Sequence, residues 1–238
     1  MKKITLLILL LFPIITTTAQ EPRFTFGVST GINQSFPTFD IWDWSDQDKK
    51  QWEIPGNSEK GLTGFQIGLD AEYRLTNTFY LQSGLYYTTR RTKLEYLDIG
   101  TPSGLYYYTD KFNTGYLKVP LLVALKTRLS TKALLYFRGG SYFAQGISGK
   151  FKSTKTYIKE EGANGIITQE SHSLFGKSYF QRFDWGLSFG AGIEIHRFVV
   201  GVDYDLGLQN ILKNYDLYLL ESNKVKNRSL SLMAGYRF

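Results

Sequence analysis

Apolar and polar residues alternate strictly along eight stretches of the chain. Such alternation is typical of β-strands with one apolar and one polar face. The pattern predicts strands at 24–33, 65–74, 79–90, 117–126, 134–146, 183–196, 200–209 and 229–238. The stretch 183–196 alternates most clearly, whereas Gly139 and Gly140 blur both faces of 134–146. Lengths of about 9–13 residues suit tilted strands that cross a membrane.

The connections between these stretches alternate in length. Short turns are predicted at Thr76-Asn77, at 129–132 and near Arg197. The other connections are long and polar, and they are predicted as loops over roughly 34–60, 92–114, 147–180 and 210–227. Short periplasmic turns and long extracellular loops are typical of an up-and-down barrel in an outer membrane. Both chain ends are then expected on the periplasmic side.

Every predicted strand needs a cover for its apolar face. The sequence contains no amphipathic helix of useful length, so the lipid bilayer is the expected cover. In lipid every backbone N–H and C=O must be paired, and only closure of the sheet removes its two edges. We therefore predict an all-β fold, an eight-stranded antiparallel up-and-down transmembrane β-barrel over residues 20–238. A soluble lipocalin-like barrel, with its apolar side chains inside, is the structural alternative.

The first residues have the features of a cleaved signal peptide. Lys2 and Lys3 precede a short apolar stretch, and small residues lead to Ala19. That stretch is shorter than the roughly 20 residues of a transmembrane helix. We expect a signal peptide over 1–19, cleavage after Ala19 and export to the bacterial outer membrane.

Composition supports strands and argues against a nucleic-acid partner. Aromatic residues make up 16% of the chain, which contains 23 Gly and no Cys. Aromatic side chains favour strands and membrane interfaces. The formal net charge is +7, but the basic residues are scattered and form no stripe on a helix. We therefore expect no nucleic acid to bind.

Charged residues recur on the polar faces of the predicted strands. Acids and bases balance within this set, which is Asp70, Glu72, Arg74, Arg90, Lys118, Lys126, Arg138, Asp184, Glu194, Asp203, Asp205 and Arg237. Unpaired buried charges are costly, and side chains can fill an eight-stranded barrel. We therefore predict an ion-pair network that plugs the lumen. The alternative is a solute-selecting lining, which makes the protein a narrow passive channel.

Catalytic and metal-binding candidates are few. Ser188, Glu194 and His196 share the inward face of one predicted strand, as a lipid-active enzyme in the barrel wall requires. However, Glu194 and His196 lie about 6–7 Å apart along the strand, and a triad needs hydrogen-bond contact. We expect these residues to be lumen side chains and the protein not to be an enzyme. No cluster has metal-ligand spacing, and no cofactor is expected.

The predicted loops contain three groups of residues suited to contacts. Trp42, Trp44 and Trp52 are candidates for interaction or for packing on the barrel rim. The second long loop contains Tyr106, Tyr107 and Tyr108. The third contains basic residues that suit either a solvated hairpin or contact with anionic lipopolysaccharide, namely Lys150, Lys152, Lys155 and Lys159.

Three motifs resemble the PorT-like outer-membrane β-barrel family, also called the porin-like barrel domain. They are Tyr116-Leu117-Lys118-Val119-Pro120-Leu121-Leu122, the segment 183–194 that begins Phe183-Asp184-Trp185-Gly186, and Tyr204 to Ile211. Their order and spacing match the family over roughly 23–238. The resemblance implies an integral, monomeric barrel, and the link of the family's namesake to a secretion apparatus makes secretion-complex proteins possible partners.

The last residues resemble the signal that barrel-assembly machinery recognises. Apolar positions alternate from Ser231 and end in Tyr236 and Phe238. This resemblance implies that outer-membrane lipid and the assembly machinery are partners of the chain. We expect a non-enzymatic barrel that acts in adhesion, in envelope stabilisation or in a larger assembly.

Overall fold

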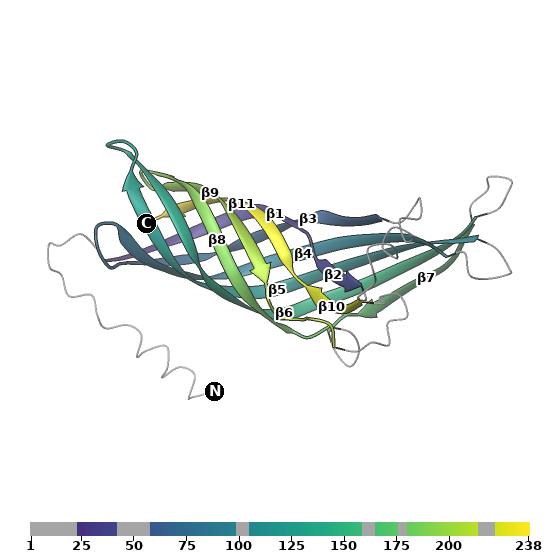
Figure 1. Ribbon diagram of the computed structural model, residues 1–238. Coiled ribbons are helices and arrows are strands. Elements are labelled where there is room, and N and C mark those ends of the chain that lie inside the picture. Colours follow the sequence, from purple (N-terminus) through teal and green to yellow (C-terminus); the bar gives the residue numbers. More distant parts are fainter. Residues whose placement is uncertain (1–22, 42–57, 99–104, 159–164, 176–179, 214–221) are drawn as a thin grey trace, which may run out of the picture.

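The computed structural model describes residues 23–41, 58–98, 105–158, 165–175, 180–213 and 222–238. These residues form an all-β structure (Figure 1). Its strands are β1 (Phe24–Ser35), β2 (Thr38–Ile41), β3 (Ser58–Arg74), β4 (Phe79–Asp98), β5 (Leu105–Arg128), β6 (Ala133–Ile158), β7 (Gly165–Ser173), β8 (Phe183–Ile195), β9 (Phe198–Gly207), β10 (Ser222–Lys226) and β11 (Arg228–Arg237). None of the described segments is a helix long and apolar enough to cross a membrane.

Eight strands close into a ring. Neighbours follow the order β5-β4-β3-β1-β11-β9-β8-β6, and an additional pairing of β5 with β6 closes the sheet. Every pairing in the ring is antiparallel. The first and last strands meet in continuous register from Gly27↔Arg237 to Ser35↔Ser229. The predicted eight-stranded antiparallel barrel is confirmed.

The apolar faces of the ring strands point outward. Phe26 is 59% exposed, Leu69 61% and Leu121 51%, whereas the polar Asp184 is fully buried. Large apolar side chains in contact with bulk water are unfavourable, and a bilayer removes that cost. This arrangement is the reverse of a lipocalin, so the soluble alternative is wrong.

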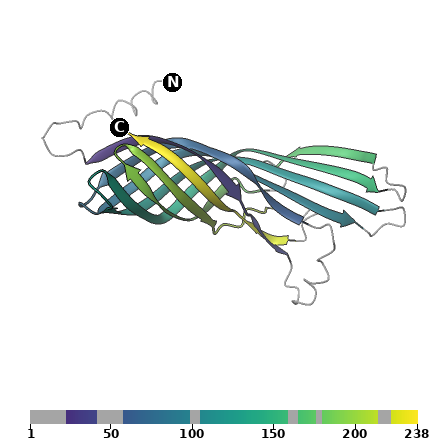
Figure 2. The ribbon, with the colours of Figure 1, turned by 90° about the horizontal axis from the view of Figure 1, so that it is seen from above.

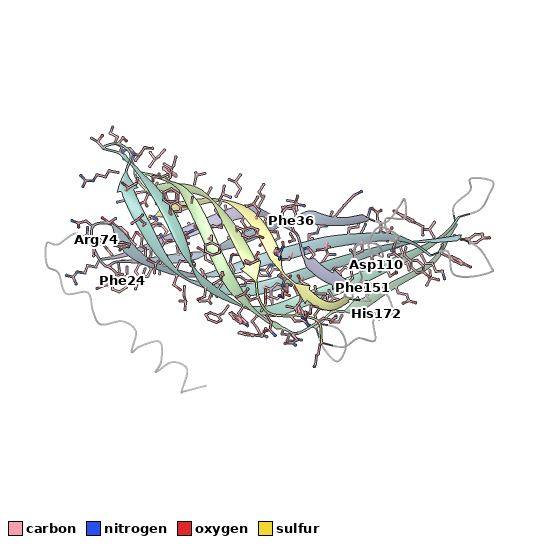
Figure 3. The ribbon with its side chains drawn as sticks, viewed as in Figure 1. Phe24, Phe36, Arg74, Asp110, Phe151 and His172 are labelled. Carbon is pink, nitrogen blue, oxygen red and sulfur yellow. The ribbon has the colours of Figure 1, made fainter. Side chains whose placement is uncertain are left out.

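The predicted short turns lie at one end of the barrel. The Leu75 N–H donates to the Phe79 carbonyl at 3.0 Å, and the Leu129 N–H donates to the Ala133 carbonyl at 3.0 Å. His196 joins β8 to β9 with a φ of 57°, a left-handed conformation that is typical of tight turns. Phe24 and Arg74 lie at this end (Figure 3), as does the end of β11 (Figure 1).

Three strands run far beyond the ring at the other end. β4 has 20 residues, β5 has 24 and β6 has 26, and β7 extends the sheet along β6 (Figure 2). We call this part, 91–98, 105–113, 150–158 and β7, the projecting sheet. The prediction of loops over 92–114 and 147–180 was wrong for most of these residues. These residues extend beyond the membrane into water, where neither face of a strand has to be apolar. Their hydropathy therefore does not identify them as strands.

The other two predicted loops also contain strands. β2 and β10 form a separate two-stranded sheet, which lies within the predicted loops 34–60 and 210–227. β3 begins at Ser58, and Phe36 donates its N–H to the Arg228 carbonyl at 2.8 Å. The prediction of loops was therefore wrong for 38–41, 58–60 and 222–226. The expected signal peptide, 1–19, lies outside the described residues.

Candidate functional site

The inward-facing charges form a layer of ion pairs near the short turns. Lys126 Nζ lies 2.6 Å from Glu72 Oε1 and 2.8 Å from Glu194 Oε2. The Arg237 guanidinium lies 2.5 Å from the same Glu72 oxygen and 3.6 Å from Glu194. Four strands supply these side chains, so two cations and two carboxylates neutralise one another across the lumen.

A second layer crosses the middle of the barrel. Arg138 makes a bidentate pair with Asp203, with Nε at 2.8 Å from Oδ1 and Nη2 at 2.5 Å from Oδ2. A Cβ at Gly190 would overlap the Asp203 carboxylate, so glycine leaves room for this pair. On the facing wall, Asp70 accepts hydrogen bonds from the Tyr86 and Ser29 hydroxyls.

The third layer is the most deeply buried. Arg90 Nη1 lies 2.7 Å from Asp184 Oδ2, and Lys118 Nζ lies 2.9 Å from Asp205 Oδ2. Asp184 also accepts hydrogen bonds from the Tyr142 hydroxyl at 3.2 Å and the Asn227 amide at 3.0 Å. Four charges are thus removed from water and paired with one another. Removal of one partner from such a pair typically costs about 3–5 kcal/mol.

Arg74 is the twelfth predicted lumen charge. It is half-buried at the end of β3, where its backbone N–H donates to the Arg23 carbonyl at 2.8 Å. The other eleven take part in the three layers.

An apolar cap, which the sequence analysis missed, closes the opposite mouth of the barrel. Tyr116 and Phe175 pack with their ring centroids 5.7 Å apart, and Phe180 packs on Phe112 at 6.1 Å. The full apolar cap comprises Phe112, Tyr116, Tyr142, Ala144, Phe151, Leu174, Phe175, Phe180, Ile211, Leu212 and Val225. The isolated apolar pairs Leu174-Phe175 and Ile211-Leu212 within polar stretches were the available signal.

Two small voids lie among the inward-facing side chains. One, of about 20 Å³, is lined by residues that include Asp70, Tyr136 and Arg138. The other, of about 30 Å³, lies between Arg90 and the apolar cap. A void needs roughly 10–15 Å³ to hold one water molecule, so each has room for one or two.

Comparison with known proteins places the chain in a family. Residues 18–213 match the model of the outer membrane protein beta-barrel domain. The chain belongs to this family. Comparison with curated protein sequences gives no match.

Several solved outer-membrane barrels are similar to this family member. Ail, the attachment invasion locus protein of Yersinia pestis, is 18% identical with a TM-score of 0.36, covering 91% of this chain and all of Ail. OprG from Pseudomonas aeruginosa is 12% identical with a TM-score of 0.42, covering 90% of this chain and 95% of OprG. The outer membrane protein AlkL is 12% identical with a TM-score of 0.43, covering 94% and 95% respectively. These similarities carry no information on ligands.

In this outer-membrane barrel, Ser188, Glu194 and His196 do not form a triad. The Ser188 hydroxyl donates to Asp205 at 2.8 Å, and Glu194 is paired with Lys126 and Arg237. His196 is an exposed turn residue. Within the described ranges, no group of three or more His, Cys, Asp or Glu is placed to hold a metal ion.

The predicted loop and terminal candidates have different locations. Trp42, Trp44 and Trp52 lie outside the described residues, as does Lys159. Phe238 is 67% exposed at the barrel end, where its N–H donates to the Phe26 carbonyl at 2.8 Å and the Tyr236 ring packs 5.8 Å away.

The projecting sheet has an aromatic face, on the side that continues the lumen. Tyr96 and Tyr108 stack with ring centroids 5.0 Å apart and planes 3° apart, and Tyr106 lies 5.4 Å from Tyr157. Lys155 Nζ lies 3.9 Å from the Tyr106 centroid, within the range of a cation–π contact. We call these five residues the tyrosine face.

Asp110 lies on the same side as the tyrosine face, outside the membrane. It is 1% exposed and accepts a hydrogen bond from the Tyr96 hydroxyl at 3.4 Å. Burial raises the pKa of the Asp110 carboxyl, although hydrogen bonds from Ser153 and Tyr96 oppose the shift.

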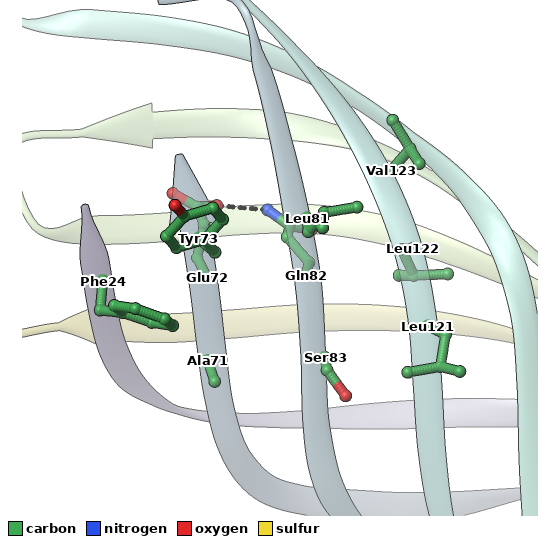
Figure 4. Close-up of a pocket in the computed structure, with 10 residues that line it drawn as sticks. All are labelled: Phe24, Ala71, Glu72, Tyr73, Leu81, Gln82, Ser83, Leu121, Leu122 and Val123. Atoms are coloured by element: carbon green, nitrogen blue, oxygen red, sulfur yellow. Dashed lines mark hydrogen bonds between the residues drawn. The ribbon is translucent and has the colours of Figure 1, made fainter. Parts of the chain in front are cut away.

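A hollow of about 370 Å³ lies in the outer wall of the barrel (Figure 4). Its rim carries the outward apolar residues Phe24, Leu81 and Leu121, and Gln82 donates to Glu72 at 2.6 Å behind it. The rim belongs to the apolar outer face, so lipid chains are the chemistry that fills it.

Proposed function

We propose that this protein is a sealed, non-enzymatic outer-membrane barrel that displays the projecting sheet as an extracellular binding surface. The proposal rests on the division of the molecule into a filled barrel and a projecting sheet. Paired charges and the apolar cap fill the barrel, while three of its strands continue far into the medium.

The filling of the lumen favours a sealed barrel over a narrow channel. A passive channel needs a continuous polar path, whereas the Lys126, Arg138 and Arg90 layers each extend between opposite walls. The apolar cap lies above the Arg90 layer and adds a barrier to ions. An eight-stranded barrel has little further room, because its interior is just wide enough for side chains.

The tyrosine face supports binding to an extracellular protein or glycan. Tyrosine gives a large contact area at a low conformational cost, because only two side-chain torsions become fixed. Tyr106, Tyr108 and Tyr157 are half-buried, so each keeps part of its ring at the surface. The adjoining Lys155 adds a donor and a positive charge.

We also propose membership of the narrower PorT-like group, a cleaved signal peptide over 1–19 and recognition of Tyr236 and Phe238 by barrel-assembly machinery. The motif residues Lys118 and Asp184 belong to the third ion-pair layer, and Tyr116 belongs to the apolar cap. The PorT-like motifs are therefore explained by the filling of the lumen. A secretion-complex partner remains part of this narrower proposal.

Conductance in a planar bilayer tests the seal. We expect the refolded full-length protein to give no discrete, voltage-stable openings in 1 M KCl, with a large porin as the positive control in the same chamber. Resistance to SDS until boiling verifies that the sample is folded. Stable unitary openings from heat-modifiable protein would instead establish the channel.

A second experiment tests the binding surface. Proteoliposomes carrying the protein are applied to an array of extracellular matrix proteins and glycans, beside the variant Tyr106→Ser/Tyr108→Ser. We expect binding to some array members that the variant loses by tenfold or more. The matched control Tyr73→Ser/Tyr204→Ser changes two tyrosines on the outer wall of the barrel. Absence of binding, or equal binding by the Tyr106/Tyr108 variant, would contradict the role of the tyrosine face.

A further inference from the structure

Basic side chains gather on the outward face of the projecting sheet and of the adjoining end of β3, opposite the tyrosine face. Cross-strand register places Lys60 opposite Lys93, Lys93 opposite Lys111, and Lys111 opposite Lys152. One row further down, Arg91 faces Asn113, which faces Lys150. We call Lys60, Arg91, Lys93, Lys111, Lys150 and Lys152 the cationic ladder.

Among the described residues, ion pairs neutralise only part of the cationic ladder. Glu95 lies 2.6 Å from Lys93 and 3.6 Å from Lys60. The Arg91 Nε donates at 3.1 Å to the uncharged Asn113. Directly opposed like charges on neighbouring strands are destabilising, so four lysines in one cross-strand row favour a bound anion.

The height of the ladder matches the headgroup layer of a membrane. On β5 the outward apolar face ends at Leu117, and Asn113 and Lys111 lie four and six residues before it in the chain, towards the projecting sheet. At about 3.3 Å per residue and a tilt near 40°, these positions lie roughly 10 and 15 Å above the apolar band. Phosphates attached to lipids of the outer leaflet occupy this zone.

A hollow beside the ladder connects apolar and cationic surface. Its volume is about 430 Å³, and Phe65 and Tyr87 line its lower part. Arg91 and Lys150 line it towards the projecting sheet, and Thr89 and Ser148 add hydroxyl groups. A soluble polyanion would contact the cationic part of the hollow only. A phosphorylated lipid has acyl chains for the aromatic part and phosphates for the cationic part.

The opposite half of the wall ends at the membrane surface. β9 and β11 have 10 residues each, and among the described residues no corresponding row of lysines lies across them. Among the described residues, a cross-strand row of lysines therefore lies on one side of the barrel wall.

We propose that the cationic ladder and its hollow bind the phosphorylated headgroup of an outer-leaflet glycolipid, of the lipid A type. The lysines and Arg91 contact the phosphates, and Phe65 and Tyr87 contact the adjoining acyl chains. The bound lipid neutralises the row of lysines and holds the projecting sheet upright at the membrane surface. This inference does not depend on what the tyrosine face binds.

Binding of fluorescent lipid A to the folded full-length protein in zwitterionic detergent tests the proposal. The probes are bisphosphorylated lipid A and the same lipid with both phosphates removed. We expect the variant Lys111→Gln/Lys150→Gln/Lys152→Gln to bind the bisphosphorylated form about 100-fold more weakly, since each of the three lysines near an anionic surface contributes a factor of about five. The dephosphorylated form is expected to bind the unaltered protein as weakly as the bisphosphorylated form binds the variant.

A matched variant, Arg23→Gln/Arg128→Gln/Lys132→Gln, removes the same charge from exposed residues at the short-turn end. It is expected to bind normally. A second variant, Ser148→Trp, fills the hollow without a change of charge and is expected to weaken binding by about tenfold. Resistance to SDS until boiling verifies the fold of each variant.

Equal affinity of the unaltered protein and the Lys111/Lys150/Lys152 variant would overturn the proposal. Equal loss of affinity in the short-turn control would also overturn it, because net charge alone would then explain binding. Stronger competition by soluble heparin than by lipid A would assign the ladder to a soluble polyanion and overturn the lipid assignment.

Discussion

The barrel and the projecting sheet are built from the same strands, yet their faces have opposite character. Within the ring, β5 points Leu121 outward and buries Lys118. Further along the same strand, Lys111 points outward and Phe112 is buried on the other side. The backbone pattern is unchanged, and only the solvent outside the wall differs. The medium on each side, lipid or water, therefore determines which residues the outward face requires.

The largest expected effect comes from the third layer of the barrel. Asp184→Ala leaves the Arg90 guanidinium buried without its 2.7 Å partner. We expect a loss of about 3–5 kcal/mol in the free energy of unfolding, measured by urea titration in lipid vesicles. Glu170→Ala, on the projecting sheet, is the control and should change it by less than about 0.5 kcal/mol. A loss below 1 kcal/mol for Asp184→Ala would mean that the layer is hydrated.

A charge placed on the outward face distinguishes the two regions directly. Leu121→Arg puts a cation among lipid chains and is expected to cost about 2–4 kcal/mol in the same urea titration. Thr109→Arg, on the same face of β5 in the projecting sheet, is expected to stay within about 0.5 kcal/mol. Similar costs at both positions would place the membrane boundary elsewhere.

The sequence was sufficient to predict the ring, because a lipid-facing strand must alternate. It also identified the inward charges, since polar residues on the second face of such strands have to enter the lumen. It could not predict which charges pair, because Arg90 on β4 and Asp184 on β8 meet only after the ring closes. The projecting sheet and the apolar cap were missed. In water neither sheet face has to be apolar, and Leu174-Phe175 and Ile211-Leu212 are isolated apolar pairs in polar stretches.

A smaller effect is expected from the tyrosine face. Tyr96→Ala removes the stacked contact with Tyr108, which is worth about 0.5–1.5 kcal/mol. Amide hydrogen exchange should accelerate over 91–98 of β4 and 105–113 of β5. Amides of the ring should keep their protection. Faster exchange throughout the ring would mean that the two regions unfold as one unit.

The smallest effect is expected from the titration of Asp110. Its pKa in the folded protein is raised above the ordinary value of 3.8, so the ionised carboxyl costs stability. The protonated Asp110 carboxyl therefore favours the folded state. This contribution to stability is fully present below pH 3.8, the ordinary pKa, and is lost as the pH rises through the pKa of the folded protein. Hydrogen exchange of the projecting sheet should therefore accelerate over this window, and Asp110→Asn should remove the dependence. An unchanged pH dependence in Asp110→Asn would assign the effect to another group.

Single cysteine labelling tests the central claim most directly, because the chain contains no natural cysteine. A spin label at Leu121→Cys, on the outward face, and the free thiol of Ser188→Cys, on the inward face, are examined in lipid vesicles. We expect oxygen dissolved in lipid to relax the label at 121, and a water-soluble thiol reagent to leave the cysteine at 188 unmodified. Rapid modification at 188 by that reagent, or relaxation at 121 by an aqueous nickel complex alone, would contradict a sealed barrel with its apolar face in lipid.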